Sequence, residues 1–318
     1  MNQERFEQAH REQWTAFEAM VAPGQSHAQV AEQLPEAYRR ICQHLALARD
    51  RGYSVGLVGR LNRLVLAGHQ TLYGSSLGLG PPWGRFLAGG LAVSVRTLAK
   101  PVLLAAALLG LPFAILPVAI ARHPGLAYRV VAPQQLAHME AMYQPRAGRF
   151  GRANQAQADV QMFGFYIWNN VRITFQTFAS GIFLGLGSVF YLLFNGIHGG
   201  AVAGHLTHAG LGPQFWPFVA THSALELTSL VLAGGAGLHL GWALVAPGRR
   251  TRGRALREAV RDGMPLVYGA ALMDVLAAFI EAFWSASALV PAWVKLSAAA
   301  LLWTAVATYL LLAGRRHA

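Results

Sequence analysis

The sequence predicts an all-α, polytopic membrane protein in which about six transmembrane helices follow a helical N-terminal domain. Hydrophobic residues make up 54% of the 318 residues, charged residues only 13%, and the mean hydropathy is +0.35. These values are typical of membrane-embedded chains and unusual for a soluble domain. Many of the basic residues behind the net charge of +12 flank apolar runs, as the positive-inside rule expects. We therefore expect contact with membrane lipid and none with nucleic acid.

Residues 1–82 form the predicted cytosolic helical domain, and residues 83–318 form the predicted transmembrane domain. The first part has no uncharged run long enough to cross a bilayer. Its apolar residues recur at helical spacing, as at Trp14 and Phe17 and again between Leu57 and Tyr73. The N-terminus lacks the apolar core of a signal peptide, and Cys42 is the only cysteine. The sequence thus predicts a domain that stays in the cytosol, without disulfides or a thiolate metal site.

Six spans are predicted in the second domain. They cover residues 101–121, 173–194, 196–211, 217–245, 263–284 and 295–313. Residues 83–100 are apolar but contain three basic residues, which suits a helix lying in the membrane interface. Six arginines between Arg249 and Arg261, and Arg315 and Arg316 at the C-terminus, indicate the cytosolic side. The expected location is the cytoplasmic (inner) membrane, with both termini in the cytosol.

The segment 196–211 is short for a span and leaves two topologies open. We call the stretch from Arg249 to Arg261 the arginine connection. If this connection and the N-terminal domain are both cytosolic, the chain crosses the membrane an even number of times between them, so the segment 196–211 has to cross it. The polar region 122–168, with Arg146, Arg149 and Arg152, then lies outside against the positive-inside rule. If 196–211 is only re-entrant, the segment 83–100 crosses instead.

Polar side chains from separate helices are predicted to meet at one depth in the outer half of the membrane. The cluster consists of Glu226, His222, Glu281, Arg172, His205, His208 and Asn170. A central ionised side chain costs roughly 2.5–3.5 kcal/mol on insertion scales, so a buried glutamate needs a partner. His222 and Glu226, at i and i+4, share one helix face.

Three interpretations of this cluster remain open: hydrogen bonding between helices, a site for a solute or lipid headgroup, and a metal or proton site. His222, Glu226 and His205 are the candidate metal ligands. Against a metalloenzyme, the spacing is HxxxE rather than HExxH, and no nucleophile motif accompanies it. We therefore predict no catalytic residue, no metal and no cofactor.

Glycines at fourfold spacing are predicted to let helices approach closely. These helix-packing residues are Gly181, Gly185, Gly196, Gly200, Gly204, Gly237 and Gly241.

Residues 165–285 resemble the stage II sporulation protein M family of membrane proteins. The resemblance is carried by WNNVRITFQTFASGIFLGLGSVFYLLFNGIHGGAVAGH, by THSALELTSLVLAGGAGLHLGWALVAPG and by AFIEAFW. The family's P-H-G-x-x-E-L element falls on Thr221 to Glu226 and reads T-H-S here, so His222 and Glu226 are kept while the proline and glycine are not. Its other motifs fall on Asn170, the Gly181–Gly187 run, the Asn195 and Gly196 pair, and Ile280 with Glu281.

The resemblance implies a non-enzymatic scaffold within a multiprotein membrane complex. Relatives of this kind imply a MoxR-type AAA+ ATPase or cell-wall enzymes as partners in a bacterial membrane, and sporulation itself is not inferred. We expect partners to bind residues 1–82 and the arginine connection. The alternative function is an intramembrane solute-binding or metal-dependent hydrolytic site around His222 and Glu226.

Overall fold

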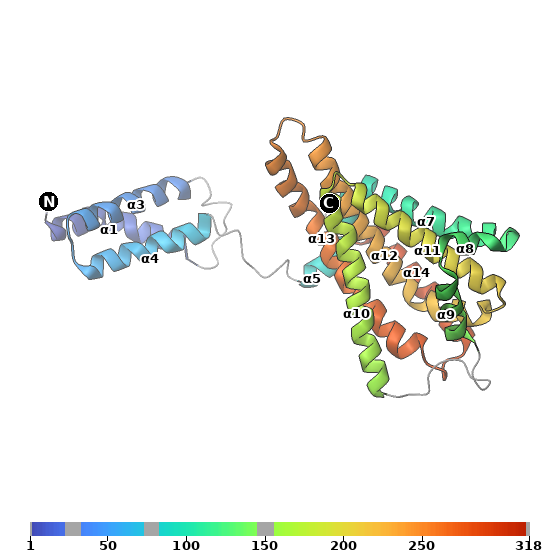
Figure 1. The fold of residues 1–318 in the computed structure, drawn as a ribbon. Helices are drawn as coiled ribbons and strands as arrows, with labels where there is room; N and C mark the ends of the chain where they lie inside the picture. The colour runs from blue at the N-terminus through green and yellow to red at the C-terminus, as the bar shows by residue number, and fades with distance from the viewer. Residues whose placement is uncertain (1, 23–32, 73–82, 145–155, 316–318) are drawn as a thin grey trace. The chain divides into compact units, whose positions relative to one another are not determined.

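The computed structural model describes residues 2–22, 33–72, 83–144 and 156–315, and nearly all of them are helical. The chain forms two compact units, Met1–Trp83 and Gly84–Ala318 (Figure 1). Arg146, Arg149 and Arg152 of the predicted basic loop, and Arg316, lie outside the described residues.

In its described residues, the first unit packs three helices around its own apolar core. These helices are α1 (Gln3–Met20), α3 (Leu34–Asp50) and α4 (Val55–Leu72). The most buried large side chains of the core are Phe6, Trp14, Phe17, Ile41 and Leu61. Burying a large apolar side chain contributes ~1.5–3 kcal/mol, so this set gives the unit a core independent of the membrane helices.

The described part of the second unit is built from six long helices and several short ones. The long helices are α7 (Ala99–Arg122), α10 (Ala156–Ala179), α11 (Leu186–His208), α12 (Gly212–Val245), α13 (Arg252–Phe279) and α14 (Ala292–Leu312). The short ones are α5 (Trp83–Arg85), η1 (Phe86–Gly90), α6 (Leu91–Thr97), η2 (Pro124–Leu126), α8 (Ala127–Val130), α9 (Pro133–Tyr143), η3 (Ser180–Ile182) and the π-helical turn η4 (Ile280–Ser285).

Five described helices are long and apolar enough to cross a membrane. They are Ala99–Arg122, Leu186–His208, Gly212–Val245, Arg252–Ser285 and Ala292–Leu312. The sixth long helix, α10, matches them in length, but Asp159, Arg172 and several amide side chains make it less apolar. The chain is therefore an all-α membrane protein with several candidate spans, five by composition rather than six.

The predicted second span, residues 173–194, is wrong in its bounds. Helix α10 ends at Ala179, a short 3₁₀ turn follows, and α11 begins at Leu186. Leu184 (φ 56°) and Gly185 (φ 84°) adopt left-handed conformations that a continuing helix does not allow. The short predicted span 196–211 accordingly falls mostly within α11, a full-length helix that ends at His208.

Contacts between the long helices fix their relative directions. Helices α7 and α11 are parallel, because Gly196 faces Leu109 while Gly204, two turns later, faces Pro117. Helices α11 and α12 are antiparallel, since Gly234 packs on Leu192.

Helix α12 also sets the directions of its other neighbours. It is antiparallel to α13, because Gly263 packs on Ala236 whereas Ser285 hydrogen-bonds to His222. It is parallel to α10, since Gly237 lies against Phe178 while Glu226 and Asn170 line one pocket.

Helix α14 completes an alternating series of directions along the chain. Its first turn lies beside Thr221, whose hydroxyl donates to the Lys295 carbonyl at 3.4 Å. Its last turn accepts hydrogen bonds from Arg96, at the carbonyls of Leu310 (2.9 Å) and Ala313 (2.6 Å). The bundle thus has two ends: an α9 end, where α7 and α11 finish, and an arginine end, where α12 passes into α13.

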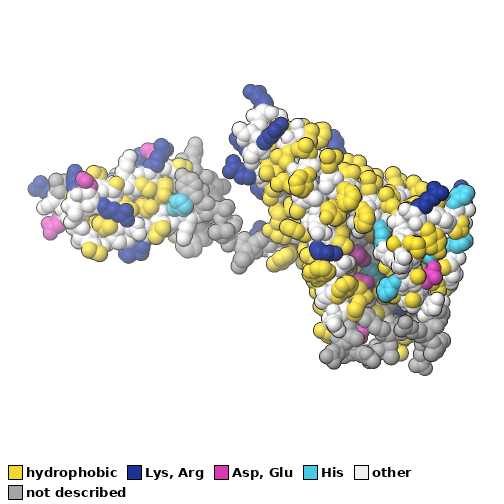
Figure 2. Space-filling model, viewed as in Figure 1, with side chains coloured by type: hydrophobic (Ala, Val, Ile, Leu, Met, Phe, Trp, Pro, Cys, Tyr) yellow, Lys and Arg dark blue, Asp and Glu magenta, His cyan; other side chains and the backbone are white. Residues whose placement is uncertain are grey.

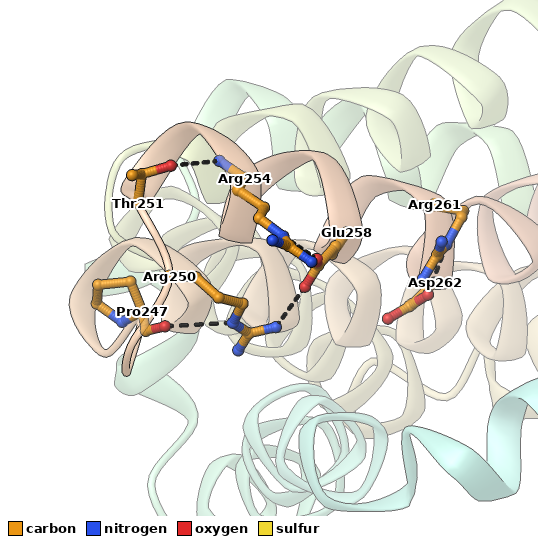
Figure 3. A network of polar contacts seen from close by, with 7 residues as sticks. All are labelled: Pro247, Arg250, Thr251, Arg254, Glu258, Arg261 and Asp262. Carbon is orange, nitrogen blue, oxygen red and sulfur yellow. Dashed lines mark hydrogen bonds and ion pairs between the residues drawn. The ribbon is translucent and has the colours of Figure 1, made fainter.

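The connection at the arginine end is held by a network around Glu258 (Figure 3). Arg250 donates to Glu258 at 2.6 Å, and Arg254 donates to the other carboxylate oxygen at 2.9 Å. Thr251 caps the N-terminus of α13 by accepting the backbone N–H of Arg254. Six arginines against Glu258 and Asp262 leave residues 246–262 with a net charge of +4 (6 − 2).

Candidate functional site

The carboxylates of Glu226 and Glu281 meet the imidazole of His222 inside the bundle. Helix α12 supplies His222 and Glu226 one turn apart, and the π-helical turn after α13 supplies Glu281. One ligand atom from each residue lies within 4.8 Å of the other two. His222 Nε2 is 3.7 Å from Glu226 Oε2, beyond the range of a hydrogen bond. We call these three residues the His–Glu cluster.

His222 is fixed in orientation by contacts on its other sides. Its side chain is almost fully buried, and its Nδ1 atom hydrogen-bonds to Ser285 Oγ at 3.1 Å. The ring of Phe218 packs edge-on against the imidazole, with centroids 5.5 Å apart. Single π-helical turns often occur at functional sites, and this one presents both Glu281 and Ser285 to α12. Nε2 is therefore left facing the two carboxylates.

Helix α9 lies beside the cluster and contributes an aromatic side chain. The Tyr143 ring packs edge-on against Phe215 at 5.4 Å and Phe218 at 5.9 Å. Burial, and then the neighbouring Glu281 carboxylate, raise the pKa of the Tyr143 hydroxyl above its usual value. Tyr143 therefore stays a neutral phenol near the cluster at neutral pH.

A pocket of about 250 Å³ opens beside the cluster and shares Glu226 with it. Figure 2 shows the hollow between α10 and the α8–α9 segment, with acidic and histidine side chains visible inside it. Its polar lining consists of Asn170, Thr174, Asn195, His198, Ser223 and Glu226. The remaining walls are apolar and come from α7, α9, α10, α11 and α12. Such a mixture is typical of ligand sites, where a few polar groups orient an otherwise apolar contact.

Asn170 and Asp274 each bury a polar atom without a hydrogen-bond partner among the described residues. Asn170 is 4% exposed and accepts a bond from Asn169 at 3.2 Å, but its Nδ2 donor has no partner. Asp274 is fully buried; its Oδ1 accepts a hydrogen bond from the Ser229 hydroxyl and the Thr174 side chain is also close, while its Oδ2 has no hydrogen-bond partner among the described residues. Unsatisfied buried polar atoms are costly, which makes both residues candidates for binding a ligand or water.

Three residues of the predicted cluster lie elsewhere. His205 Nε2 pairs with Glu140 Oε1 of α9 at 2.6 Å, with the Tyr128 ring 5.4 Å away. His208 is exposed at the last turn of α11. Arg172 is exposed too, and its guanidinium stacks 4.4 Å from the centroid of the Trp168 ring. The structure therefore joins His222, Glu226 and Glu281, with Asn170 in the adjoining pocket, and separates the other three from them.

The predicted packing glycines lie at close helix crossings. A Cβ atom on Gly196, Gly200 or Gly204 of α11 would come closer than 3.0 Å to α7. The same holds for Gly181, Gly237 and Gly241, where the end of α10 and the following turn meet α12. Gly185 is different, because its left-handed φ of 84° rather than a clash requires glycine.

The predicted cluster left out four residues that bond to its histidines or lie buried close by. Ser285 and Glu140 are ordinary surface residue types, and only the tertiary fold pairs them with histidines. Asp274 and Lys295 gave a stronger signal, because each is a charged residue type next to or within an apolar run. Lys295 is 6% exposed and donates to the carbonyls of Ser285 at 2.8 Å and Ser287 at 2.9 Å.

Comparison with known families divides the chain in the same two parts. A family described as a domain of unknown function (DUF8413) matches residues 4–74. No curated protein and no solved structure matches the chain. The model of the family described as Stage II sporulation protein M matches residues 86–286, a stretch that contains the His–Glu cluster and the pocket. The chain belongs to the stage II sporulation protein M family.

Proposed function

We propose that this protein is a non-enzymatic membrane component of a multiprotein complex and docks partners through its first unit and its arginine connection. The observation that carries the proposal is the separate helical unit, Met1–Trp83, with an aromatic core of its own. A unit that needs no membrane helix for its core is available as a docking module. The partners to test first are a MoxR-type AAA+ ATPase and cell-wall enzymes of a bacterial inner membrane, with the protein's termini in the cytosol.

The arginine connection supplies the second proposed docking surface. Glu258 neutralises part of the charge of Arg250 and Arg254, while Arg249, Arg252 and Arg257 stay exposed. Exposed cations on a hairpin ordered by ion pairs attract an acidic partner surface and speed its association.

Co-purification of partners with the full chain tests this proposal. Reversing Arg249, Arg252 and Arg257 to glutamate should lower partner recovery at least ~10-fold, because rim charges steer association. Removal of residues 1–82 should lower recovery too. The matched control reverses Arg129, an exposed arginine of α8 at the other end of the bundle, and should keep recovery unchanged. Full recovery by the triple variant and by the truncated chain alike would contradict docking at both surfaces.

A second candidate function is favoured by the pocket. Glu226 and the unpaired amide of Asn170 face about 250 Å³ of space between mainly apolar walls, which suits a small solute or a lipid headgroup. Filling the space with Val219→Trp should remove any co-purified small molecule seen by native mass spectrometry. Exposed Val118→Trp on α7 is the matched control.

A further inference from the structure

We propose that His222, Glu226 and Glu281 bind a divalent transition-metal ion such as Zn²⁺ or Mn²⁺. The inference deepens the second candidate function and rests on it, since it assigns a cation to the wall of the same pocket. The proposed set of ligands contains Glu281 in place of His205, which the sequence analysis named as a candidate ligand. One imidazole nitrogen with two carboxylates is a donor set that favours such ions over Mg²⁺ or Ca²⁺, which prefer oxygen ligands alone.

The distances within the cluster fit a shared ion better than direct hydrogen bonds. Two ligands ~2.1 Å from a tetrahedral Zn²⁺ lie roughly 3.4 Å from each other. His222 Nε2 and Glu226 Oε2 are 3.7 Å apart, and the three ligand atoms all lie within 4.8 Å of one another. A small movement of the Glu281 side chain, on a half-buried π-helical turn, brings the third ligand into range.

The surroundings of His222 have the form expected of a metal-bound histidine. A ligating imidazole usually engages its second nitrogen in a hydrogen bond that fixes its tautomer and orientation. Ser285 Oγ makes that bond to Nδ1, which leaves Nε2 for the ion. Ser285 is therefore a positioning residue, and the Lys295 ammonium holds its carbonyl at 2.8 Å.

Charge balance supplies an independent reason for a cation. Glu226 lines the pocket from α12, and Asp274 is fully buried in α13, which packs against α12. In the described part of the chain the nearby cations are engaged elsewhere, Arg172 on the Trp168 ring and Lys295 on backbone carbonyls. Buried acidic groups need a compensating charge or a proton, and a divalent ion supplies two charges.

The pocket provides a second observation that points to a ligand. Asn170 is more than nine-tenths buried and lines the pocket with Glu226, yet its Nδ2 donor has no partner among the described residues. Three protein ligands leave one coordination position open in a tetrahedral site. We expect that position to face the pocket, where the Asn170 amide can donate to an oxygen of whatever occupies it.

Metal binding to the full chain tests the proposal directly. The protein is purified in detergent without a polyhistidine tag, stripped with chelator and titrated calorimetrically with Zn²⁺ and, separately, with Mn²⁺. We expect one ion per chain for at least one of these metals and a rise in thermal stability on binding. His222→Ala and Glu281→Gln should each abolish stoichiometric binding. Ser285→Ala should weaken it ~10–100-fold, the usual effect of losing an orienting hydrogen bond.

Matched histidines distinguish this site from adventitious binding. His239→Ala removes a half-buried histidine of α12 outside the cluster and the pocket, and His208→Ala removes an exposed one; both should bind the ion as the wild type does. Glu281→Gln preserves side-chain volume, and size-exclusion chromatography shows whether it folds. This variant keeps the test valid if His222→Ala does not fold. The proposal is overturned if the wild type takes up neither ion in stoichiometric amount, or if both cluster variants still bind it. Loss of a pocket ligand in Val219→Trp with ion binding intact would separate the pocket function from the metal site.

Discussion

At the scale of single residues, His44 shows how burial sets the chemistry of the first unit. Its Nδ1 accepts a hydrogen bond from Trp14 Nε1 at 3.1 Å, and its ring stacks on His10 with centroids 4.0 Å apart. Burial above all, and then the charges of His10 and Arg40, lower the pKa of His44 from 6.5 to about 4. His44 is therefore neutral in the folded unit at neutral pH, which its role as an acceptor requires.

Acid should destabilise the first unit through His44. The unfolded histidine takes up a proton below pH 6.5 and the folded one only near pH 4, so stability is complete above pH 6.5 and falls between these values. The shift corresponds to a loss of up to ~3 kcal/mol. Urea denaturation of residues 1–83 at pH 7.5, 5.5 and 4.5 measures it. His44→Gln should reduce the change in unfolding free energy with pH, and His69→Gln at an exposed position should not. The same pH dependence in the wild type and both variants would contradict this account.

At this scale, the sequence predicted which residues share a helix face but not which partners they meet across the fold. Helix periodicity alone puts His222 and Glu226 on one face, and the cost of an intramembrane charge marks Glu281 as needing a partner. His205 has the same sequence signals, but it pairs with Glu140 because α9 folds back onto α11. No local spacing carries that information, since 65 residues separate the two partners.

At the scale of elements, the crossing of α12 with the end of α10 depends on backbones in contact. A Cβ atom on Gly237 would collide with the Ser188 side chain and with the carbonyl oxygens of Thr177 and Phe178. Ser188 in turn donates to the Thr177 carbonyl at 2.6 Å, so the neighbours cannot easily move aside. The glycine thus keeps three helical segments at contact distance.

Gly237→Ala should destabilise the bundle by about 2 kcal/mol, as overpacking of a tight crossing does. Gly253→Ala is the matched control, because Gly253 is also helical but a Cβ atom added there would meet no neighbouring atom within 4 Å. Its stability should be unchanged or slightly higher, since alanine favours helix. The loss of helicity with increasing SDS concentration measures the stability of both variants. Equal midpoints for the two would show that the crossing tolerates a methyl group.

The elements themselves were largely predictable from the sequence, and their boundaries were not. Apolar length identified α7, α12 and α14 to within five residues at each end, whereas α13 begins at Arg252, 11 residues before the predicted span at Gly263 (263 − 252). It failed between residues 173 and 194, where hydropathy stays high across a reversal of chain direction at Leu184 and Gly185. Glycine has two uses there that composition does not distinguish: close packing at Gly181 and a left-handed turn at Gly185.

At the scale of the whole second unit, the alternating helix directions give a definite topology. Helices α7, α10, α11, α12, α13 and α14 alternate in direction along the chain, so the less apolar α10 completes the series. The ends of α7 and α11 then face one side, and the α12–α13 connection faces the other.

Cysteine labelling of intact cells tests this arrangement. With Cys42 replaced by serine, His123→Cys and Ala209→Cys should react with a membrane-impermeant maleimide, because both follow helices that end on the expected outer side. Gly248→Cys should react only after the cells are opened, as should Cys42 in the unaltered chain. Labelling of positions 209 and 248 from the same side would be incompatible with α12 as a crossing helix.

The hydrogen bonds of Lys295 join the last helix mechanically to the interior of the bundle. This side chain extends from α14 to the carbonyl of Ser285, whose hydroxyl in turn holds the imidazole of His222. A tilt of α14 would therefore pull on these hydrogen bonds and move His222 relative to Glu226 and Glu281. The last helix is thus connected through Lys295 and Ser285 to the histidine in the interior of the bundle.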